Sequence, residues 1–285
     1  VTHLFREYLK QQDALPSETS ARWGSPESDG YRILGEFKHG GHGAAVLAAD
    51  TSERHRCIKF VSKAATSPHS VEELLEDLAA LRELQDTRLA RVTRIYDCFQ
   101  DQKYIYFVSE PYFGGSFRTL VSRAVKQGVP PTEDWWRGIF RQCLEGLVHL
   151  HRHAALHRDL REDNMMLKTD DFHHPQVALV DAGFAQAFGP GDEAICGTPG
   201  YIPPETWRGR RWYPKGDCFS MGVAMFQLVT ADTEGLFLLG AGCEEDIREY
   251  TCTREPAFAL VPEPCFALRE LLRQLLQKAP ARRAG

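Results

Sequence analysis

Acidic and amide side chains stand close together in residues 157–164, which read HRDLREDN. Asp159 can accept the proton of a hydroxyl group and align its oxygen for attack. Asn164 follows in the same segment, and its amide oxygen can hold a divalent metal ion. Because a charged loop is usually only a solvated loop, this segment needs companions elsewhere in the chain. Together these groups predict proton transfer beside a metal ion.

Two further charged side chains end apolar segments of the kind expected for strands. Lys59 closes the segment CIK, and Asp181 follows VALV. A lone lysine in a strand normally faces solvent, so its position ahead of a helical segment, residues 70–84, is what indicates a role. An aspartate at the end of an apolar strand, so soon after Asp159, is hard to explain by chance.

The order of these segments resembles that of a eukaryotic protein kinase. Residues 157–164 are similar to its catalytic loop, residues 177–185 to its DFG strand, and residues 196–205 to the end of its activation segment. The cofactors implied are ATP and Mg²⁺. The resemblance implies Asp159 as the base, Lys59 on the nucleotide phosphates, Arg161 at the transferring phosphate, Thr198 against the base, and Asn164 and Asp181 as metal ligands.

Residues 33–50 resemble the glycine-rich loop that covers the nucleotide phosphates in protein kinases. Glycine suits such a turn because backbone N–H groups can approach phosphates closely where no Cβ intervenes. An ordinary glycine-rich hairpin has the same pattern, and a second register with Val46 at the valine keeps only one glycine. The best register places Lys38 at the first glycine, Gly40 and Gly43 at the second and third, and Ala45 at the valine.

The resemblance also requires an acid on the helix of residues 70–84 that pairs with Lys59. Helical spacing favours Asp77. Glu73 lies one turn earlier on the same face, and Glu76 is adjacent. Asp77 is one methylene shorter than the glutamate of the family, so this pairing needs a closer helix.

Residues 106–117, YFVSEPYFGGSF, resemble the hinge against which adenine binds. The resemblance implies that backbone groups of Glu110 and Tyr112 meet the adenine ring. It also places the side chains of Cys57 and Met166 in the nucleotide site.

Ser109 stands at the gatekeeper position, where a small side chain implies an open pocket behind the hinge. With the pair Gly114-Gly115, it resembles the calcium/calmodulin-dependent branch and particularly the apicomplexan calcium-dependent kinases. The chain contains no calcium-binding loop of the D-x-D-x-D-G kind, so calcium control would lie outside it. Ser116 replaces an acid typical of kinases that prefer basic substrates, which argues against such a preference.

The sequence favours an active serine/threonine kinase that phosphorylates proteins, because GTPGY around Thr198 is typical of that class. The alternative is a pseudokinase or scaffold that binds nucleotide weakly. Lys38, Asp77 and Ala182 favour this alternative. Ala182 replaces a phenylalanine, and a truncation of that size in a core costs about 3–5 kcal/mol unless another side chain, such as Phe184, fills the space.

The activation segment has no residue to phosphorylate between Asp181 and Thr198. Ala194 occupies the usual phosphorylation position. Asp192 and Glu193 could act there as fixed anions for Arg158, or they could be solvated loop acids. The resemblance therefore implies little dependence on loop phosphorylation.

Two further matches support the fold of the C-terminal part. Glu205 ends the segment PPE and is expected to form a buried ion pair with Arg283. Asp217 resembles the helix aspartate that holds the backbone of the catalytic loop.

Hydrophobic periodicity predicts an α+β protein, and the resemblance implies the bilobal fold of protein kinases. Strand-like segments around one main helix predict a small antiparallel-sheet N-lobe over residues 31–113. Helical segments predict a larger, mostly helical C-lobe over residues 114–285. The family usually continues with another helix, and the resemblance implies that this helix is either cut off or replaced by residues 1–12. Residues 1–30, rich in Ser, Pro, Gly and Asp after an amphipathic start, predict an extension and linker.

The composition of this 285-residue chain limits the kinds of partner that it can bind. A net charge of -5 argues against nucleic-acid binding, and no apolar run is long enough to span a membrane. Eight cysteines without a CxxC pair indicate reduced thiols. We expect a cytoplasmic protein, or a secreted one if an upstream signal has been removed. The expected partners are a protein substrate and a regulatory partner that binds residues 1–12.

Overall fold

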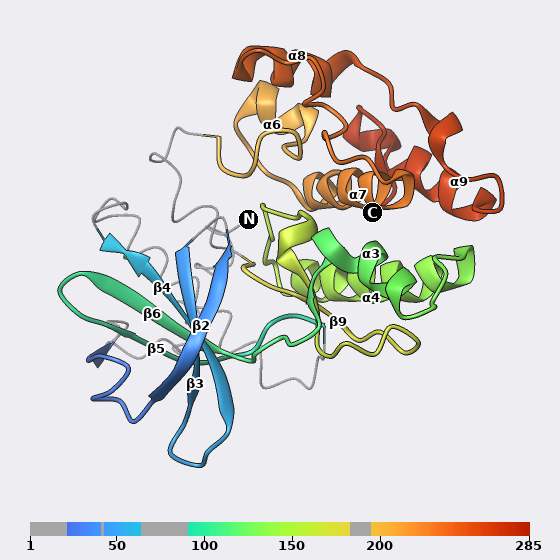
Figure 1. Ribbon diagram of the computed structural model, residues 1–285. Helices are drawn as coiled ribbons and strands as arrows, with labels where there is room; N and C mark the ends of the chain where they lie inside the picture. The colour runs from blue at the N-terminus through green and yellow to red at the C-terminus, as the bar shows by residue number, and fades with distance from the viewer. Residues whose placement is uncertain (1–21, 41–42, 64–90, 183–194) are drawn as a thin grey trace.

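The computed structural model describes residues 22–40, 43–63, 91–182 and 195–285. Within these ranges a β-sheet forms the N-terminal part of the molecule, and helices form most of the C-terminal part (Figure 1). This arrangement confirms the predicted α+β class, with an antiparallel sheet ahead of a larger helical region. The helix predicted over residues 70–84 lies outside the described residues.

The N-terminal sheet has the strand order β1-β5-β6-β4-β3-β2, and its five longer strands pair antiparallel. The central strand β4 places Ile58 and Phe60 on its core face, as a period of two requires. Ala48, Ile58, Phe99 and Val108 pack together there. The strands are β1 Arg22–Trp23, β2 Arg32–Gly40, β3 Gly43–Ala49, β4 His55–Ser62, β5 Ile95–Gln100 and β6 Tyr104–Ser109.

The described end of the expected linker, residues 22–30, lies against the sheet. Strand β1 pairs parallel with β5, and the Gly24 N–H donates to the carbonyl of Gln100 at 2.9 Å. The Lys63 ammonium lies 4.8 Å from the centre of the Trp23 ring. Two residues are too few for any periodic pattern, so the sequence could not predict this strand.

The chain passes from the sheet to the helical part through Gly114 and Gly115. The Gly114 N–H donates to the carbonyl of Leu167 at 3.0 Å. A Cβ on Gly114 would lie 2.1 Å from the carbonyl oxygen of Thr169, and Gly115 has a φ of +71°. Only glycine fits this crossing without a shift of the backbone.

Helices α4 and α7 form the centre of the helical part. Thr132 caps the start of helix α4, because its side chain accepts from the Trp135 N–H at 3.3 Å, and one face of the helix is buried. Helix α7 is buried on almost all faces, so it forms the middle of the core. The helices are α3 Leu120–Lys126, α4 Glu133–Arg152, α6 Pro204–Gly209, α7 Pro214–Thr230, α8 Glu244–Thr253 and α9 Phe266–Leu275.

A second, three-stranded sheet lies between these two parts. Its strands are β7 Gly115–Ser116, β8 Met165–Leu167 and β9 Val177–Leu179. Segment 157–164 leads into β8, and Asp181 follows β9, so this sheet brings the two predicted motifs together. Within the described ranges, no helix has the length and apolar character needed to cross a bilayer.

Candidate active site

Asp217 on α7 lies under segment 157–164 and holds its backbone. Its carboxylate accepts hydrogen bonds from the N–H groups of His157 at 2.9 Å and Arg158 at 2.8 Å, and contacts Nε2 of His151 at 2.9 Å. Arg158 has a φ of +67°, a conformation that is strained for a non-glycine residue. These bonds to a buried anion offset that strain and confirm the predicted position of Asp217.

Asp159 is held by hydrogen bonds on both carboxylate oxygens. The Thr198 hydroxyl donates to Oδ1 at 2.6 Å, and Asn164 Nδ2 donates to Oδ2 at 2.9 Å. Arg161 Nη1 donates to the Thr198 hydroxyl at 3.3 Å. One threonine therefore joins a carboxylate to a guanidinium, and the structure brings all four predicted residues together.

Lys59 and Asp181 form an ion pair between the sheet and the end of β9. The ammonium nitrogen lies 2.6 Å from Oδ2, and only 16% and 22% of the two side chains are exposed. The N–H of Val180 donates to the carbonyl of Asn164 at 2.9 Å. The residue before Asp181 is therefore bonded to Asn164, so the two predicted metal ligands lie on neighbouring backbone segments.

The side chains of Asn164 and Asp181 fit a magnesium site by their donor chemistry. Carboxylate and amide oxygens are the hard ligands that Mg²⁺ prefers. Nδ2 of Asn164 donates to both the carbonyl and the carboxylate of Asp159, at 2.6 and 2.9 Å. These two bonds direct the amide nitrogen toward Asp159, which leaves Oδ1 as the atom suited to a metal.

Ser109, Cys57 and Met166 lie on three different strands. Ser109 ends β6 opposite Cys57 on β4, and Met166 lies in the middle of β8. Burial raises the pKa of the Cys57 thiol to about 11, so this thiol stays protonated near neutral pH.

Side-chain contacts of Glu110 and Tyr112 hold the segment that follows Ser109. Glu110 lies 3.6 Å from Lys168 and accepts from the Tyr96 hydroxyl at 3.4 Å. The Tyr112 hydroxyl is 3.0 Å from that of Thr93. Burial raises the pKa of the Tyr112 phenol, so it remains a neutral hydrogen-bonding group.

The predicted phosphate loop is a hairpin of β2 and β3. Gly40 pairs with Gly43 across its tip, and Ala45 pairs with Lys59 on β4. The loop therefore continues the strand that neighbours Lys59. The candidate residues Asp77, Phe184, Asp192, Glu193 and Ala194 lie outside the described residues.

The predicted ion pair of Glu205 and Arg283 is confirmed. The two guanidinium nitrogens of Arg283 lie 2.6 and 2.9 Å from the carboxylate oxygens, and the Arg283 side chain is fully buried. Arg283 also donates to the carbonyls of Lys215 and Gln277. This pair ties the start of α6 to the C-terminal end of the described chain.

Three contacts near the site were not predicted from the sequence. Each joins residues far apart in the chain, and no spacing rule would have found them. They are Tyr112 with Thr93, Arg118 with Asp163, and Glu162 with Tyr201.

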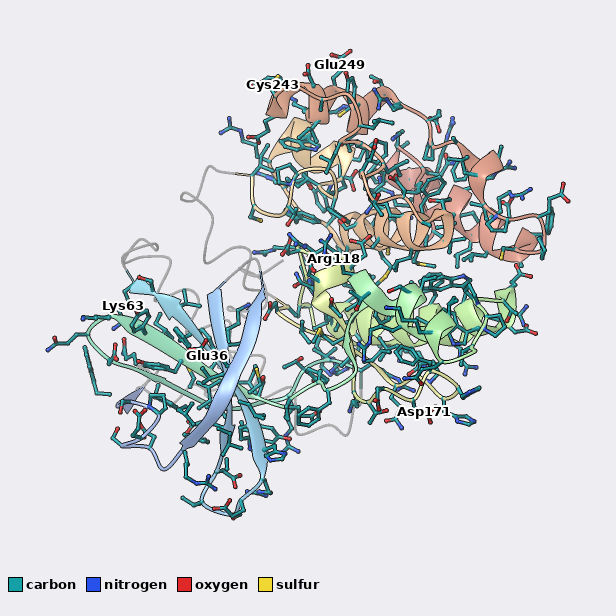
Figure 2. The ribbon with its side chains drawn as sticks, viewed as in Figure 1. Glu36, Lys63, Arg118, Asp171, Cys243 and Glu249 are labelled. Atoms are coloured by element: carbon teal, nitrogen blue, oxygen red, sulfur yellow. The ribbon has the colours of Figure 1, made fainter. Side chains whose placement is uncertain are left out.

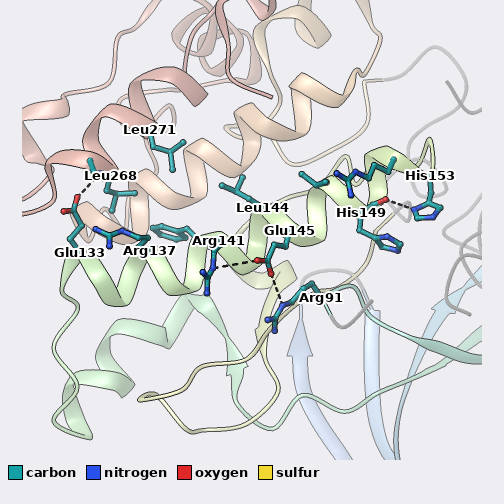
Figure 3. Close-up of a pocket in the computed structure, with 14 residues that line it drawn as sticks. Arg91, Glu133, Arg137, Arg141, Leu144, Glu145, His149, His153, Leu268 and Leu271 are labelled. Atoms are coloured by element: carbon teal, nitrogen blue, oxygen red, sulfur yellow. Dashed lines mark hydrogen bonds and ion pairs between the residues drawn. The ribbon is translucent and has the colours of Figure 1, made fainter. Parts of the chain in front are cut away.

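A groove of about 900 Å³ lies elsewhere, between α4 and α9 (Figure 3). Leucine and phenylalanine side chains line it, and Arg91 and Arg141 contact Glu145 at its edge. None of its lining residues belongs to the predicted site. The groove is therefore a separate surface feature.

The chain belongs to the protein kinase domain family, which matches residues 31–285. Human serine/threonine-protein kinase ULK3 is 30% identical over 266 residues, which cover 92% of this chain and 54% of that protein. Mouse ULK3 has the same identity and coverage. Serine/threonine-protein kinase atg1 of Dictyostelium discoideum is 28% identical over 163 residues, 56% of this chain and 24% of that protein. The chain spans about half the length of the ULK3 relatives.

Proposed function

We propose that the chain is a serine/threonine protein kinase that transfers the γ-phosphoryl group of ATP to protein hydroxyl groups, with Mg²⁺ as cofactor. The observation that carries this proposal is Asp159, held by Thr198 and Asn164 and joined through the Asn164 backbone to the strand of Asp181. The relatives named serine/threonine-protein kinases support the same activity.

In this proposal, Asp159 accepts the proton of the attacking hydroxyl. The hydroxyl oxygen forms a bond to the γ-phosphorus, and the bond from that phosphorus to the β–γ bridging oxygen breaks, leaving ADP. Lys59 binds the α- and β-phosphates, and Arg161 stabilises charge on the transferring group. Mg²⁺, when bound by Asn164 and Asp181, neutralises phosphate charge.

The nucleotide site of this proposal lies between the sheet and β8. Asp77 is the proposed partner of Lys59 on the helix of residues 70–84. The other residues proposed to surround the nucleotide are Gly40, Gly43, Ala45, Cys57, Ser109, Glu110, Tyr112 and Met166.

Ser109 is proposed as a small gatekeeper with an open pocket behind it. Inhibitors that carry a bulky aryl group should bind the wild type, and Ser109→Met should abolish this binding because the longer side chain fills the pocket. Dissociation constants measured by calorimetry test this prediction. Equal affinity of both proteins would refute the open pocket.

Activity is proposed to need no phosphate on the activation segment, because residues 182–197 contain no Ser, Thr or Tyr. Treatment with a phosphatase should leave the rate unchanged. A large loss of activity after this treatment would contradict the proposal.

We divide the chain, as a proposal, into an extension (residues 1–30), an N-lobe (residues 31–113) and a C-lobe (residues 114–285). The relatives support the kinase family without supporting the calcium/calmodulin-dependent branch specifically. We therefore propose that the chain is related more closely to the ULK3 and atg1 kinases than to that branch. Cytoplasmic location and a regulatory partner for residues 1–12 are further proposals.

The test of the proposed activity is transfer of labelled phosphate from Mg-ATP to a generic protein substrate. Asp159→Asn should abolish transfer, because an amide cannot accept the proton. Asp171→Asn, in the exposed loop between β8 and β9, is the matched control and should keep the rate (Figure 2). If the wild type transfers no more phosphate than Asp159→Asn, the proposed enzyme activity is wrong. The alternative function, a pseudokinase or scaffold, is then favoured.

A further inference from the structure

The segment that follows Asp159 carries two acids, and the first of them is not available to a substrate. Glu162 is buried, with 7% of the residue exposed. It accepts from the Tyr201 hydroxyl at 2.5 Å and from Gln227 Nε2 at 2.8 Å. Both carboxylate oxygens therefore have partners inside the protein.

The second acid, Asp163, lies between two arginines. Arg118 donates to its two oxygens at 2.7 and 2.5 Å, and Arg161 Nε lies 3.1 Å from Oδ2. The carboxylate is already paired with two arginines, so a substrate lysine or arginine would have to displace an internal guanidinium.

At this edge of the site two guanidinium groups contact one carboxylate, and the most exposed of these three charged groups is a cation. Arg118 is the outer one, with 59% of its side chain exposed, whereas 16% of Arg161 is exposed. Figure 2 shows Arg118 on the side of the helical part that faces the sheet. Asp163 occupies two of the five N–H donors of Arg118, and within the described residues the others make no hydrogen bond.

This edge is connected to the proposed base. Arg118 contacts Asp163, Asp163 contacts Arg161, and Arg161 donates to Thr198, whose hydroxyl donates to Asp159. The exposed Arg118 is therefore linked by four successive contacts to the residue that the acceptor hydroxyl must reach.

We propose that this edge selects acceptor segments that carry an aspartate or glutamate beside the hydroxyl residue, with Arg118 as the residue that determines this specificity. The inference rests on the phosphotransfer proposed above. A carboxylate can take bidentate hydrogen bonds from a guanidinium, whereas a substrate lysine is repelled by both arginines.

The test compares three serine peptides of equal length, in which the residues flanking the serine are glutamate, glutamine or lysine. We expect kcat/KM to be about fivefold higher for the glutamate peptide than for the glutamine peptide at low salt, and lower still for the lysine peptide. The preference should shrink as salt rises, because an exposed charge is screened. Equal values for the three peptides would overturn the inference.

Arg118→Gln should remove the preference for glutamate, and Arg118→Glu should reverse it. Arg141→Gln is the matched control, because Arg141 is an exposed arginine on α4 outside the site, and it should keep the wild-type preference. If Arg118 only holds the loop, Arg118→Gln will slow all three peptides equally and leave their ratio unchanged, which overturns the inference. ATP hydrolysis without peptide, compared with Asp159→Asn, separates this failure from failure of the proposed activity.

Discussion

Thr198 joins the two charged groups closest to the proposed transfer. Its hydroxyl donates to Asp159 at 2.6 Å and accepts from Arg161 at 3.3 Å. A hydroxyl is both a donor and an acceptor, so one small side chain can hold an anion and a cation at the same time. The position of the base therefore depends on a residue from a distant part of the chain.

Thr198→Val keeps the shape of the side chain and removes the hydroxyl. A hydrogen bond to a charged group contributes about 1.5–3 kcal/mol, so kcat should fall about 10- to 100-fold. Thr198→Ser keeps the hydroxyl and should retain most of the rate. Steady-state kinetics with a protein substrate measures both, and an unchanged kcat in Thr198→Val would contradict a positioning role.

His157 should make stability depend on pH. Burial lowers its pKa below the usual value near 6.5, so below this pH the unfolded chain binds a proton more readily than the folded chain. The contribution of His157 to stability is therefore fully present well above pH 6.5 and is lost as the pH falls below this value. His157→Phe should reduce the loss between pH 7.5 and 5.5 by about 1 kcal/mol, measured by urea unfolding. Identical losses in both proteins would show that another group is responsible.

At the scale of elements, the sequence predicts those helices and strands that have a clear hydrophobic pattern. The strands around Lys59 follow from a pattern with a period of two, and the apolar run of residues 218–229 indicates the buried helix that carries Asp217. The residues proposed as catalytic follow from the order of motifs. The pair of Arg118 with Asp163 does not follow, because it depends on how the turn after β7 meets segment 157–164. The sequence therefore predicts which candidate residues the structure brings together, but not the contacts that surround them.

Glu205 and Arg283 hold α6 against the end of the described chain. Arg283→Met would leave a mostly buried carboxylate without its partner, which typically costs about 3–5 kcal/mol. Adding Glu205→Met removes the unpaired charge, so the double variant should be more stable than Arg283→Met alone. Chemical unfolding of both variants measures this coupling. If the two substitutions are strictly additive, the ion pair does not hold these elements together.

At the scale of the whole molecule, residues 91–93 connect the sheet to the helical part. The Thr93 N–H donates to the carbonyl of Leu179 at 2.8 Å, and the Leu179 N–H donates to that of Arg91 at 2.7 Å. Thr93 also contacts the Tyr112 hydroxyl at 3.0 Å. One short segment therefore bonds both to the residue proposed to meet adenine and to the strand that leads to Asp181.

Tyr112→Phe removes one hydroxyl from this connection and keeps the ring. A neutral hydrogen bond contributes about 1 kcal/mol, so stability should fall by that amount. If the bond also sets the position of the segment proposed to bind adenine relative to β9, KM for ATP should rise about fivefold. The value of kcat should change little, because the base Asp159 is untouched. Tyr213→Phe, an exposed tyrosine outside the site, is the control for both measurements. A loss of stability with an unchanged KM would mean that the Tyr112 hydroxyl only supports the fold, and that the two parts are aligned by other contacts.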